Sequence, residues 1–162
     1  MPDLLKPLAP SSFALDIDGL GELVCKSVKL ANYNPKLAGE ADAIGSGSGG
    51  KSFRQINSAG FEELVTFEVV VICSSSPGSA SKALWAWFKA CLPPSDGGDG
   101  KWAESKKTGS VKAFDTDDKQ VAEWVFKEAW PSVYSLAECS VQDNKYLEEN
   151  WTIVCESFKR EM

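Results

Sequence analysis

Several short runs of this sequence place an apolar residue at every second position. Residues 13–17 follow this spacing, and residues 63–74 repeat it, with apolar residues on both faces toward the end of the run. A period of two gathers the apolar side chains on one face of a β-strand. Turn-forming pairs such as Asp18-Gly19 separate the runs. The pattern therefore predicts a mainly β protein with antiparallel strands.

The expected strands can be placed by residue range. Two strands form a hairpin within residues 13–30, one strong strand covers 63–74, and the last third of the chain is all β. Strands are expected there at 110–115, 120–128, 134–143 and 146–158, with a turn at 115–118. We therefore expect an antiparallel β-barrel or sandwich of about six or seven strands.

One stretch has the periodicity of a helix instead. Its large apolar residues recur at i, i+3, i+4 and i+7, namely Leu84, Trp87, Phe88 and Cys91. Pro93-Pro94 would end such a helix, so it is predicted over residues 81–92, flanking the sheet. Trp85 and Trp87 would lie about 200° apart around its axis, and one of them must face a second surface.

Two segments have the composition of loops. Residues 34–60 are rich in Asn, Pro, Gly, Ala and Ser, and residues 95–109 are rich in Gly, Asp and Lys. Both contain too few large apolar residues to contribute to a core, so the first is predicted to be a long loop and the second a shorter one. A single domain over residues 1–162 accommodates all of these elements.

Composition excludes several classes of function. The chain has no histidine, which removes Ser-His-Asp and Cys-His catalysis and histidine metal sites. Its five cysteines form no C-x-x-C pair and are expected to be reduced, buried thiols. The net charge of −6 would repel nucleic-acid phosphates. We therefore expect no enzyme activity, no cofactor and no metal.

The chain is also expected to stay out of membranes. No apolar run approaches the roughly 18 residues that a membrane-spanning helix requires. The N-terminal residues lack a basic region followed by a long apolar stretch, the pattern of a signal peptide. We expect neither export by a signal peptide nor membrane insertion.

Residues 45–52 match the spelling of a phosphate-binding P-loop, Gly45-x-x-x-x-Gly50-Lys51-Ser52. A working P-loop follows a buried strand and opens a helix. Residues 37–44 do not form such a strand, and Gly60 would soon interrupt the helix. A flexible Gly/Ser loop is the preferred interpretation, and a nucleotide-binding protein is kept as an alternative.

Acidic residues elsewhere have simple structural explanations. The aspartates of residues 115–118 suit a hairpin turn better than a calcium loop, since no bidentate Glu follows at the required distance. Glu148 and Glu149 would point to opposite faces of a strand, which does not suit a shared acid/base site. Both are expected to be solvated.

The C-terminal third carries a specific pattern. An aromatic strand from Ala122 runs into the step Ala129-Trp130-Pro131, and Tyr134 follows. This segment resembles the tail-tube proteins of contractile phage tails and extracellular contractile injection systems. The hairpin that begins at Phe13, the helix over 83–92 and the stretch from Asn144 to Glu156 are also similar to that family.

The resemblance implies a structural role. It implies homohexameric rings that stack into a hollow inner tube for cargo or DNA delivery, with the sheath, baseplate and spike proteins as partners. The protein would be cytoplasmic during assembly and then part of a phage tail or phage-tail-like particle. A baseplate-proximal ring that initiates the tube is the alternative within the family, and a monomeric β-sandwich binding module is the alternative outside it.

Candidates for the inter-subunit interface come from the long loop and from the aromatic residues. The resemblance implies that this loop reaches neighbouring subunits. A chain with six tryptophans has more aromatic surface than a small monomer needs, and subunit interfaces are enriched in such residues. The candidate residues are Asn34, Pro35, Gly45, Gly50, Lys51, Ser52, Trp85, Trp130 and Tyr134.

Overall fold

The computed structural model describes residues 8, 12–30, 35–38, 45–46, 49–50, 52–53, 57–61, 65–92, 100–142 and 144–161. By their contacts the residues form two compact units. The first contains residues 1–31 and 65–162, and the second contains residues 32–64. The prediction of a single domain over 1–162 stays a prediction.

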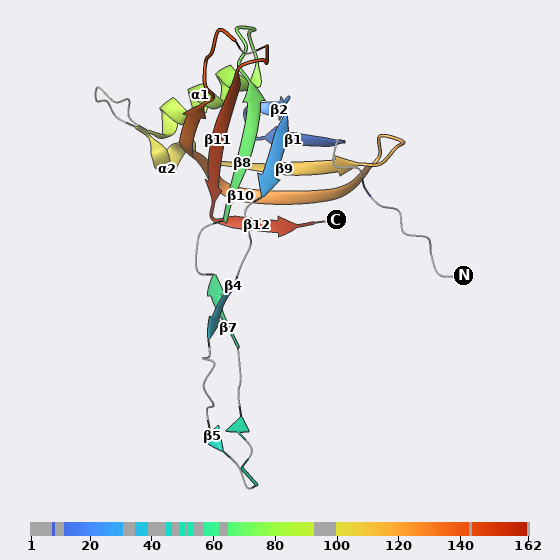
Figure 1. Cartoon of the computed structure of the whole chain (residues 1–162), viewed down its shortest axis with the longest axis vertical. Coiled ribbons are helices and arrows are strands. Elements are labelled where there is room, and N and C mark those ends of the chain that lie inside the picture. Colours follow the sequence, from blue (N-terminus) through green and yellow to red (C-terminus); the bar gives the residue numbers. More distant parts are fainter. Residues whose placement is uncertain are drawn as a thin grey trace. The chain divides into compact units, whose positions relative to one another are not determined.

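The first unit is built on one antiparallel sheet of eight strands among the described residues (Figure 1). These strands are β1 (Phe13–Ile17), β2 (Gly21–Leu23), β3 (Ser27–Leu30), β8 (Val65–Ile72), β9 (Lys107–Phe114), β10 (Gln120–Leu136), β11 (Glu148–Cys155) and β12 (Ser157–Arg160). Their order is β2–β1–β9–β10–β11–β8–β3, and β12 also pairs with β10. The predicted mainly β fold is confirmed, although the sheet has more strands than expected and does not close.

Strand β10 joins the two halves of this sheet, one formed by β1, β2, β9 and β12 and the other by β3, β8 and β11. Its first part pairs with β9 and β12, and its last part pairs with β11. Register shifts between Phe126 and Ala129, and again between Pro131 and Val133, interrupt the ladders. Irregularities of this kind bend a strand, and Figure 1 shows β9 and β10 crossing β8 and β11.

The prediction of separate strands at 120–128 and 134–143 was therefore wrong. One strand of 17 residues runs from Gln120 to Leu136. Pro131 lies at the second register shift, where a missing amide hydrogen is tolerated, so the proline does not end the strand. Beyond Leu136, the described residues up to 142 form no strand.

Two other ranges contain more strands than predicted. The range 13–30 holds three, because after the β1–β2 hairpin the chain crosses to pair β3 with β8. The range 146–158 is divided at Glu156, whose amide donates a hydrogen bond to the Lys127 carbonyl between β11 and β12. Both differences arise from pairing between segments that are distant in the sequence.

Buried side chains of the two halves and of the helix form one core. The alternation in β8 holds as expected, with its odd-numbered residues buried. Phe67 of β8 meets Phe126 of β10 with ring centroids 4.8 Å apart. The largest fully buried side chains also include Trp87, Trp151, Leu15, Ile17, Leu84 and Ile153.

Helix α1 (Ala80–Cys91) confirms the helix predicted over 81–92, displaced by one residue. Ser79 caps it, with its hydroxyl accepting a hydrogen bond from the Lys82 amide. Trp87 is 2% exposed and Trp85 is 44% exposed, so the two tryptophans do face different surroundings. Neither helix among the described residues has the length and apolar character needed to cross a bilayer.

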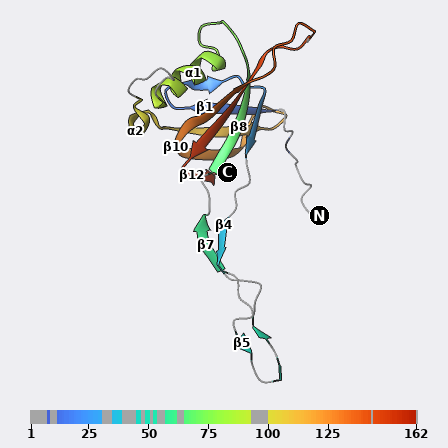
Figure 2. The same ribbon diagram turned by 60° about the vertical axis from the view of Figure 1, so that its left-hand side comes forward.

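A short helix, α2 (Trp102–Ser105), and the start of β9 at Lys107 lie within residues 95–109. The prediction of a loop was wrong for these residues. Trp102 packs edge-on against Trp130 of β10, with ring centroids 6.0 Å apart, and the Lys101 amide donates to the carbonyl of Ala90 at the end of α1. Figure 2 shows α1 and α2 side by side.

In the second unit the described segments pair in two short ladders. Strand β4 (Pro35–Ala38) pairs with β7 (Asn57–Phe61), and β5 (Gly45–Ser46) pairs with β6 (Ser52–Phe53). The prediction of a loop over 34–60 was wrong for these strands. Such ladders use backbone groups, which a Gly/Ser-rich sequence possesses without any apolar alternation.

Candidate assembly surface

Helix α1 places a half-exposed tryptophan over the end of the sheet. The Trp85 ring lies 5.1 Å from that of Tyr134 on β10 and 6.2 Å from that of Trp151 on β11, measured between centroids. Tyr134 and Trp151 are cross-strand partners, and Phe88 covers Trp151 from the helix side. We call these four residues the aromatic cluster: Trp85, Phe88, Tyr134 and Trp151.

A buried carboxylate lies beside the aromatic cluster. Glu149 is 7% exposed. Ser81 Oγ donates to its Oε2 at 2.7 Å, and the Tyr134 hydroxyl donates to its Oε1 at 3.1 Å. The prediction that Glu149 is solvated was wrong. Glu149 lies two residues before the buried Trp151 on the same face of β11, a spacing that could have revealed its position. Glu148, on the other face, pairs with Lys26.

A pocket of about 400 Å³ lies beside Trp85 and Glu149, and we call it the helix pocket. It is lined by Ser81, Lys82, Trp85, Ala86, Lys89, Tyr134 and Glu149. Helix α1 contains no acidic residue, so it contributes two positive charges to the pocket and no negative one. The pocket combines a half-exposed aromatic ring with charged groups. Such an arrangement suits a side chain or a turn of another protein.

The partly buried hydrogen bond from Tyr134 to Glu149 leads to an expectation at alkaline pH. Burial, and secondly the hydrogen bond to Glu149, raise the pKa of Tyr134 from 10.0 to about 12. Below pH 10 the phenol is protonated in both the folded and the unfolded chain. As pH rises toward 12, the unfolded chain loses this proton first, so the folded state should lose stability.

Denaturant unfolding at a series of pH values between 10 and 12 checks this expectation, with tyrosinate absorbance measured in parallel. Wild type should lose unfolding free energy more steeply across this window than Tyr134→Phe, which has no phenol to titrate at this position. Equal slopes in the two proteins would show that Tyr134 does not control the alkaline transition.

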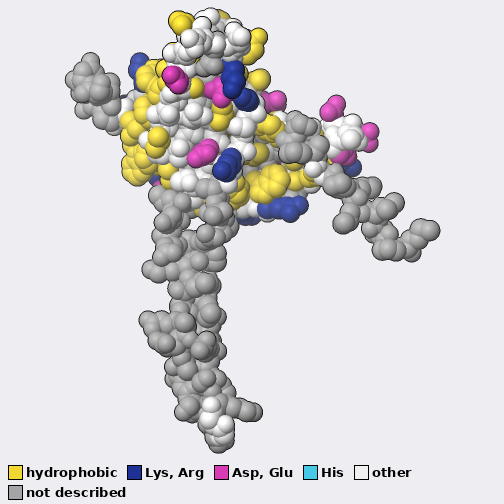
Figure 3. All heavy atoms as spheres, in the orientation of Figure 1, with side chains coloured by type: hydrophobic (Ala, Val, Ile, Leu, Met, Phe, Trp, Pro, Cys, Tyr) yellow, Lys and Arg dark blue, Asp and Glu magenta, His cyan; other side chains and the backbone are white. Residues whose placement is uncertain are grey.

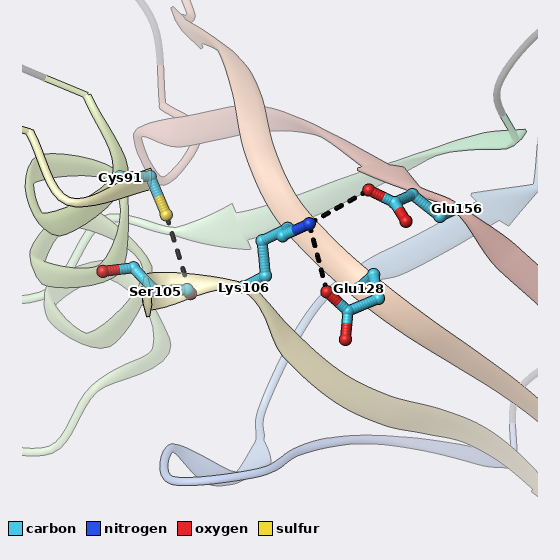
Figure 4. Close-up of polar contacts among 5 residues, drawn as sticks. All are labelled: Cys91, Ser105, Lys106, Glu128 and Glu156. Carbon is cyan, nitrogen blue, oxygen red and sulfur yellow. Dashed lines mark hydrogen bonds and ion pairs between the residues drawn. The ribbon is translucent and has the colours of Figure 1, made fainter. Parts of the chain in front are cut away.

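A second polar cluster joins three segments of the first unit (Figure 4). Lys106 Nζ lies 3.1 Å from Glu128 Oε2 and 3.1 Å from Glu156 Oε1. Its side chain is 16% exposed, and its ammonium lies 4.7 Å from the centre of the Trp102 ring. The hydrogen bonds to Glu156 and then to Glu128 raise the pKa of Lys106 above its usual value. The cluster therefore links the residue before β9 and the junction of β11 and β12 to the bend of β10.

The cysteines are all free, as expected, but not all buried. Cys91 and Cys155 are buried and Cys25 is half-buried, whereas Cys73 and Cys139 are exposed. Burial raises the pKa of the Cys25 and Cys155 thiols to about 11, which keeps them protonated at neutral pH. Within the described ranges, no three His, Cys, Asp or Glu side chains come together as they would around a metal ion.

Three of the candidate interface residues lie in the first unit. The structure brings Trp85 and Tyr134 together in the helix pocket. Trp130 is not part of this pocket, because its ring packs against Trp102. Two charged residues of the pocket, Lys82 and Lys89, were not among the candidates, although their spacing of seven residues on the predicted helix places them on one face.

The other candidates belong to the second unit. Pro35 opens β4 opposite Phe61, Gly45 lies opposite Phe53, and Ser52 lies opposite Ser46. Gly50 is exposed and has a φ of 74°, a left-handed conformation that glycine adopts readily. Asn34 and Lys51 lie outside the described residues.

The residues that match the P-loop motif begin and end in two paired strands. Gly45 belongs to β5 and Ser52 to β6, and these strands form a ladder with each other. The described segments that follow are strands as well, where a P-loop would open a helix. This context favours the interpretation of residues 45–52 as a Gly/Ser-rich turn region over a nucleotide site.

Comparisons with known proteins agree on the fold. One similar solved structure is the PVC sheath–tube complex of an extracellular contractile injection system in its extended state, with a TM-score of 0.69, 12% identity, and 96% of this chain and 91% of that chain covered. The tube-terminating cap of the anti-feeding prophage has a TM-score of 0.73 and 10% identity, with 99% of this chain and 94% of that chain covered. Hcp1 from Flavobacterium johnsoniae has a TM-score of 0.50 and 17% identity, with 92% of this chain and 94% of that chain covered.

At these identities the structural matches show a shared fold. A search of curated proteins found no match. The family model for the T4-like virus tail tube protein gp19 matches residues 35–159, a range that includes the Ala129-Trp130-Pro131 step. This match confirms the resemblance drawn from the sequence, and it extends over well more than half of the 162 residues. The chain belongs to the T4-like gp19 family of tail tube proteins.

Proposed function

We propose that this chain is the repeating subunit of the inner tube of a contractile tail or injection system. Six copies close a ring, and rings stack into a hollow tube through which cargo or DNA passes. The observation that carries the proposal is the match to the tail tube family over residues 35–159. The role is structural, and shape and assembly take the place of catalysis.

The open sheet supports assembly with further copies. Strands β2 and β3 end the sheet on opposite sides, and each pairs with one neighbour only among the described residues. Unpaired backbone groups on an edge strand favour pairing with another chain unless something covers them. A ring of identical subunits supplies that cover by placing the sheet edge of one copy beside the next.

Exposed apolar side chains near the end of β10 also support assembly with further copies. Trp85, Val133 and Leu136 are each more than two fifths exposed. Val133 and Leu136 lie three residues apart on one strand and therefore on opposite faces. Contacts on both faces fit a subunit with neighbours on more than one side.

Residues 35–61 are proposed to contact neighbouring subunits as well. Their described segments pair only with one another, as a separate compact unit. The proposed partners beyond further copies are the sheath, baseplate and spike proteins. One of the similar solved structures is itself a sheath–tube complex. The proposed location is the cytoplasm during assembly and the finished particle afterwards.

Sedimentation velocity combined with negative-stain microscopy tests the proposal. The purified chain should sediment at about six times the mass of the single chain and form rings that stack into tubes. A species of single-chain mass at high concentration, with no rings in the micrographs, would contradict it. Single rings that never stack would favour the alternative of a special ring at an end of the tube, such as a baseplate-proximal one.

A further inference from the structure

The helix pocket has a positive rim. Lys82 and Lys89 line it from α1, on either side of Trp85. Its one acidic lining residue, Glu149, is almost fully buried, and both its oxygens accept hydrogen bonds from hydroxyls of Ser81 and Tyr134. The charge that the pocket presents to solvent is therefore mainly that of the lysines. This positive surface stands out in a chain whose net charge is −6.

The turn between β9 and β10, residues 115–118, has the opposite charge. Asp115 is used within the turn, because its Oδ1 accepts hydrogen bonds at 2.9 Å from the amides of Asp117 and Lys119. Asp117 and Asp118 are exposed, and Asp118 has a φ of 57°, which directs the chain sharply around the turn. We call residues 115–118 the acidic turn. Its internal hydrogen bonds fix the backbone from which the two exposed carboxylates project before any partner arrives.

The acidic turn and the helix pocket lie at opposite ends of one strand. The turn leads directly into Gln120, the first residue of β10, whereas Tyr134 of the pocket lies near its end. Figures 1 and 2 both show α1 on one side of the first unit and the β9–β10 turn on the other. In Figure 3 the turn appears as a projection with acidic side chains. The two surfaces cannot meet within one chain.

We propose that the acidic turn of one copy docks in the helix pocket of the next, with Asp117 and Asp118 facing Lys82 and Lys89. This inference rests on the proposed function. Two different, complementary surfaces on opposite sides of a subunit form a head-to-tail contact, and repetition of such a contact around an axis closes a ring. Opposite charges steer the two surfaces together, and the half-exposed Trp85 supplies apolar contact area between the lysines.

Charge reversal on each side tests the contact. Lys89→Glu changes the pocket, and Asp117→Lys changes the turn without touching Asp115 or the left-handed Asp118. Each single variant should raise the concentration needed for half-maximal ring formation by about tenfold or more, because an attraction becomes a repulsion. The double variant Lys89→Glu/Asp117→Lys should return it to near the wild-type value. Circular dichroism confirms that all variants fold.

Mixing provides the sharper arm of the experiment. In an alternating ring of the two single variants, the charge-reversed pocket of one chain would face the charge-reversed turn of the next. The unchanged pocket and the unchanged turn would face each other at every second contact. An equimolar mixture of Lys89→Glu and Asp117→Lys chains should therefore form rings where neither chain does alone. Matched controls reverse charge at exposed positions elsewhere, Lys127→Glu and Glu138→Lys, and should assemble as wild type.

Each outcome is decisive. Rings in both single variants at the wild-type concentration would overturn the contact, as would single variants that fail and are rescued neither by the double variant nor by mixing. The first pattern would leave the helix pocket to a different partner, such as the sheath, whereas the second would show that Lys89 and Asp117 do not face each other. Wild-type chains that form no rings would instead overturn the proposed function itself, so the two failures are distinguishable.

Discussion

Replacing Trp151 by alanine should lower the free energy of unfolding by about 3–5 kcal/mol. The Trp151 side chain is 1% exposed and lies at the centre of the aromatic cluster, with its ring centroid 4.6 Å from that of Tyr134 and 5.6 Å from that of Phe88. Removing it would leave a large cavity between α1 and β11. Denaturant unfolding, followed by far-ultraviolet circular dichroism, measures the change.

Trp151→Phe separates packing from hydrogen bonding. Within the described part of the chain, Trp151 Nε1 has no hydrogen-bond partner, and a buried donor without a partner costs about 1–3 kcal/mol. Phenylalanine removes this donor and keeps most of the ring, so its cost should stay below about 2 kcal/mol. Trp102→Ala, at a side chain that is 44% exposed, should also cost much less than Trp151→Ala. Equal losses in all three variants would contradict this account of the core.

Gly109→Ala should destabilise the protein by about 3 kcal/mol, although alanine is a small residue. Gly109 lies on β9 opposite Ile17 of β1 and Phe126 of β10. A Cβ atom at this position would lie 2.5 Å from the backbone oxygen of Asp16 and 2.5 Å from Phe126 Cζ. The phenyl ring can be displaced only into a packed core, and the carbonyl belongs to a paired strand. Thermal or denaturant unfolding of the variant provides the measurement.

Two further variants isolate the cause of this loss. Gly109→Ala/Phe126→Leu removes the ring contact and leaves the carbonyl contact. In the Phe126→Leu background, Gly109→Ala should therefore still lower the unfolding free energy, but by less than it does in wild type. Gly78→Ala changes a glycine with a φ of 74° and no neighbouring atom within 4 Å, so its cost is backbone strain alone, about 1 kcal/mol. A Gly109→Ala loss no greater than that of Gly78→Ala would argue against a steric origin.

Local pattern predicted those parts of the fold in which neighbouring residues determine the structure. The alternation in residues 65–72 and the helical spacing of 84–91 were sufficient for β8 and α1. The continuity of β10 was not predictable in this way, because Pro131 normally argues against a strand and is tolerated here by a register shift. Likewise, nothing local shows that the chain crosses after the β1–β2 hairpin to pair β3 with β8.

The same division applies to the candidate surface. The angle between Trp85 and Trp87 on a helix was enough to predict that one of them faces outward. Tyr134 on β10, the partner of Trp85, was named as a candidate through the family resemblance, and the structure supplies their contact. Glu149 was misplaced because its charge was weighed and its position relative to Trp151 was not. A carboxylate in a buried row requires hydrogen-bond donors, and here these are the hydroxyls of Ser81 and Tyr134.

The length of β10 has a mechanical consequence. The strand extends from the acidic turn to the helix pocket as one uninterrupted backbone of 17 residues. In a head-to-tail ring, covalent bonds of β10 would carry tension along the circumference through each subunit, and noncovalent contacts would carry it from one subunit to the next. Stretching or widening such a ring would therefore strain the interfaces between subunits before it deformed the subunits themselves.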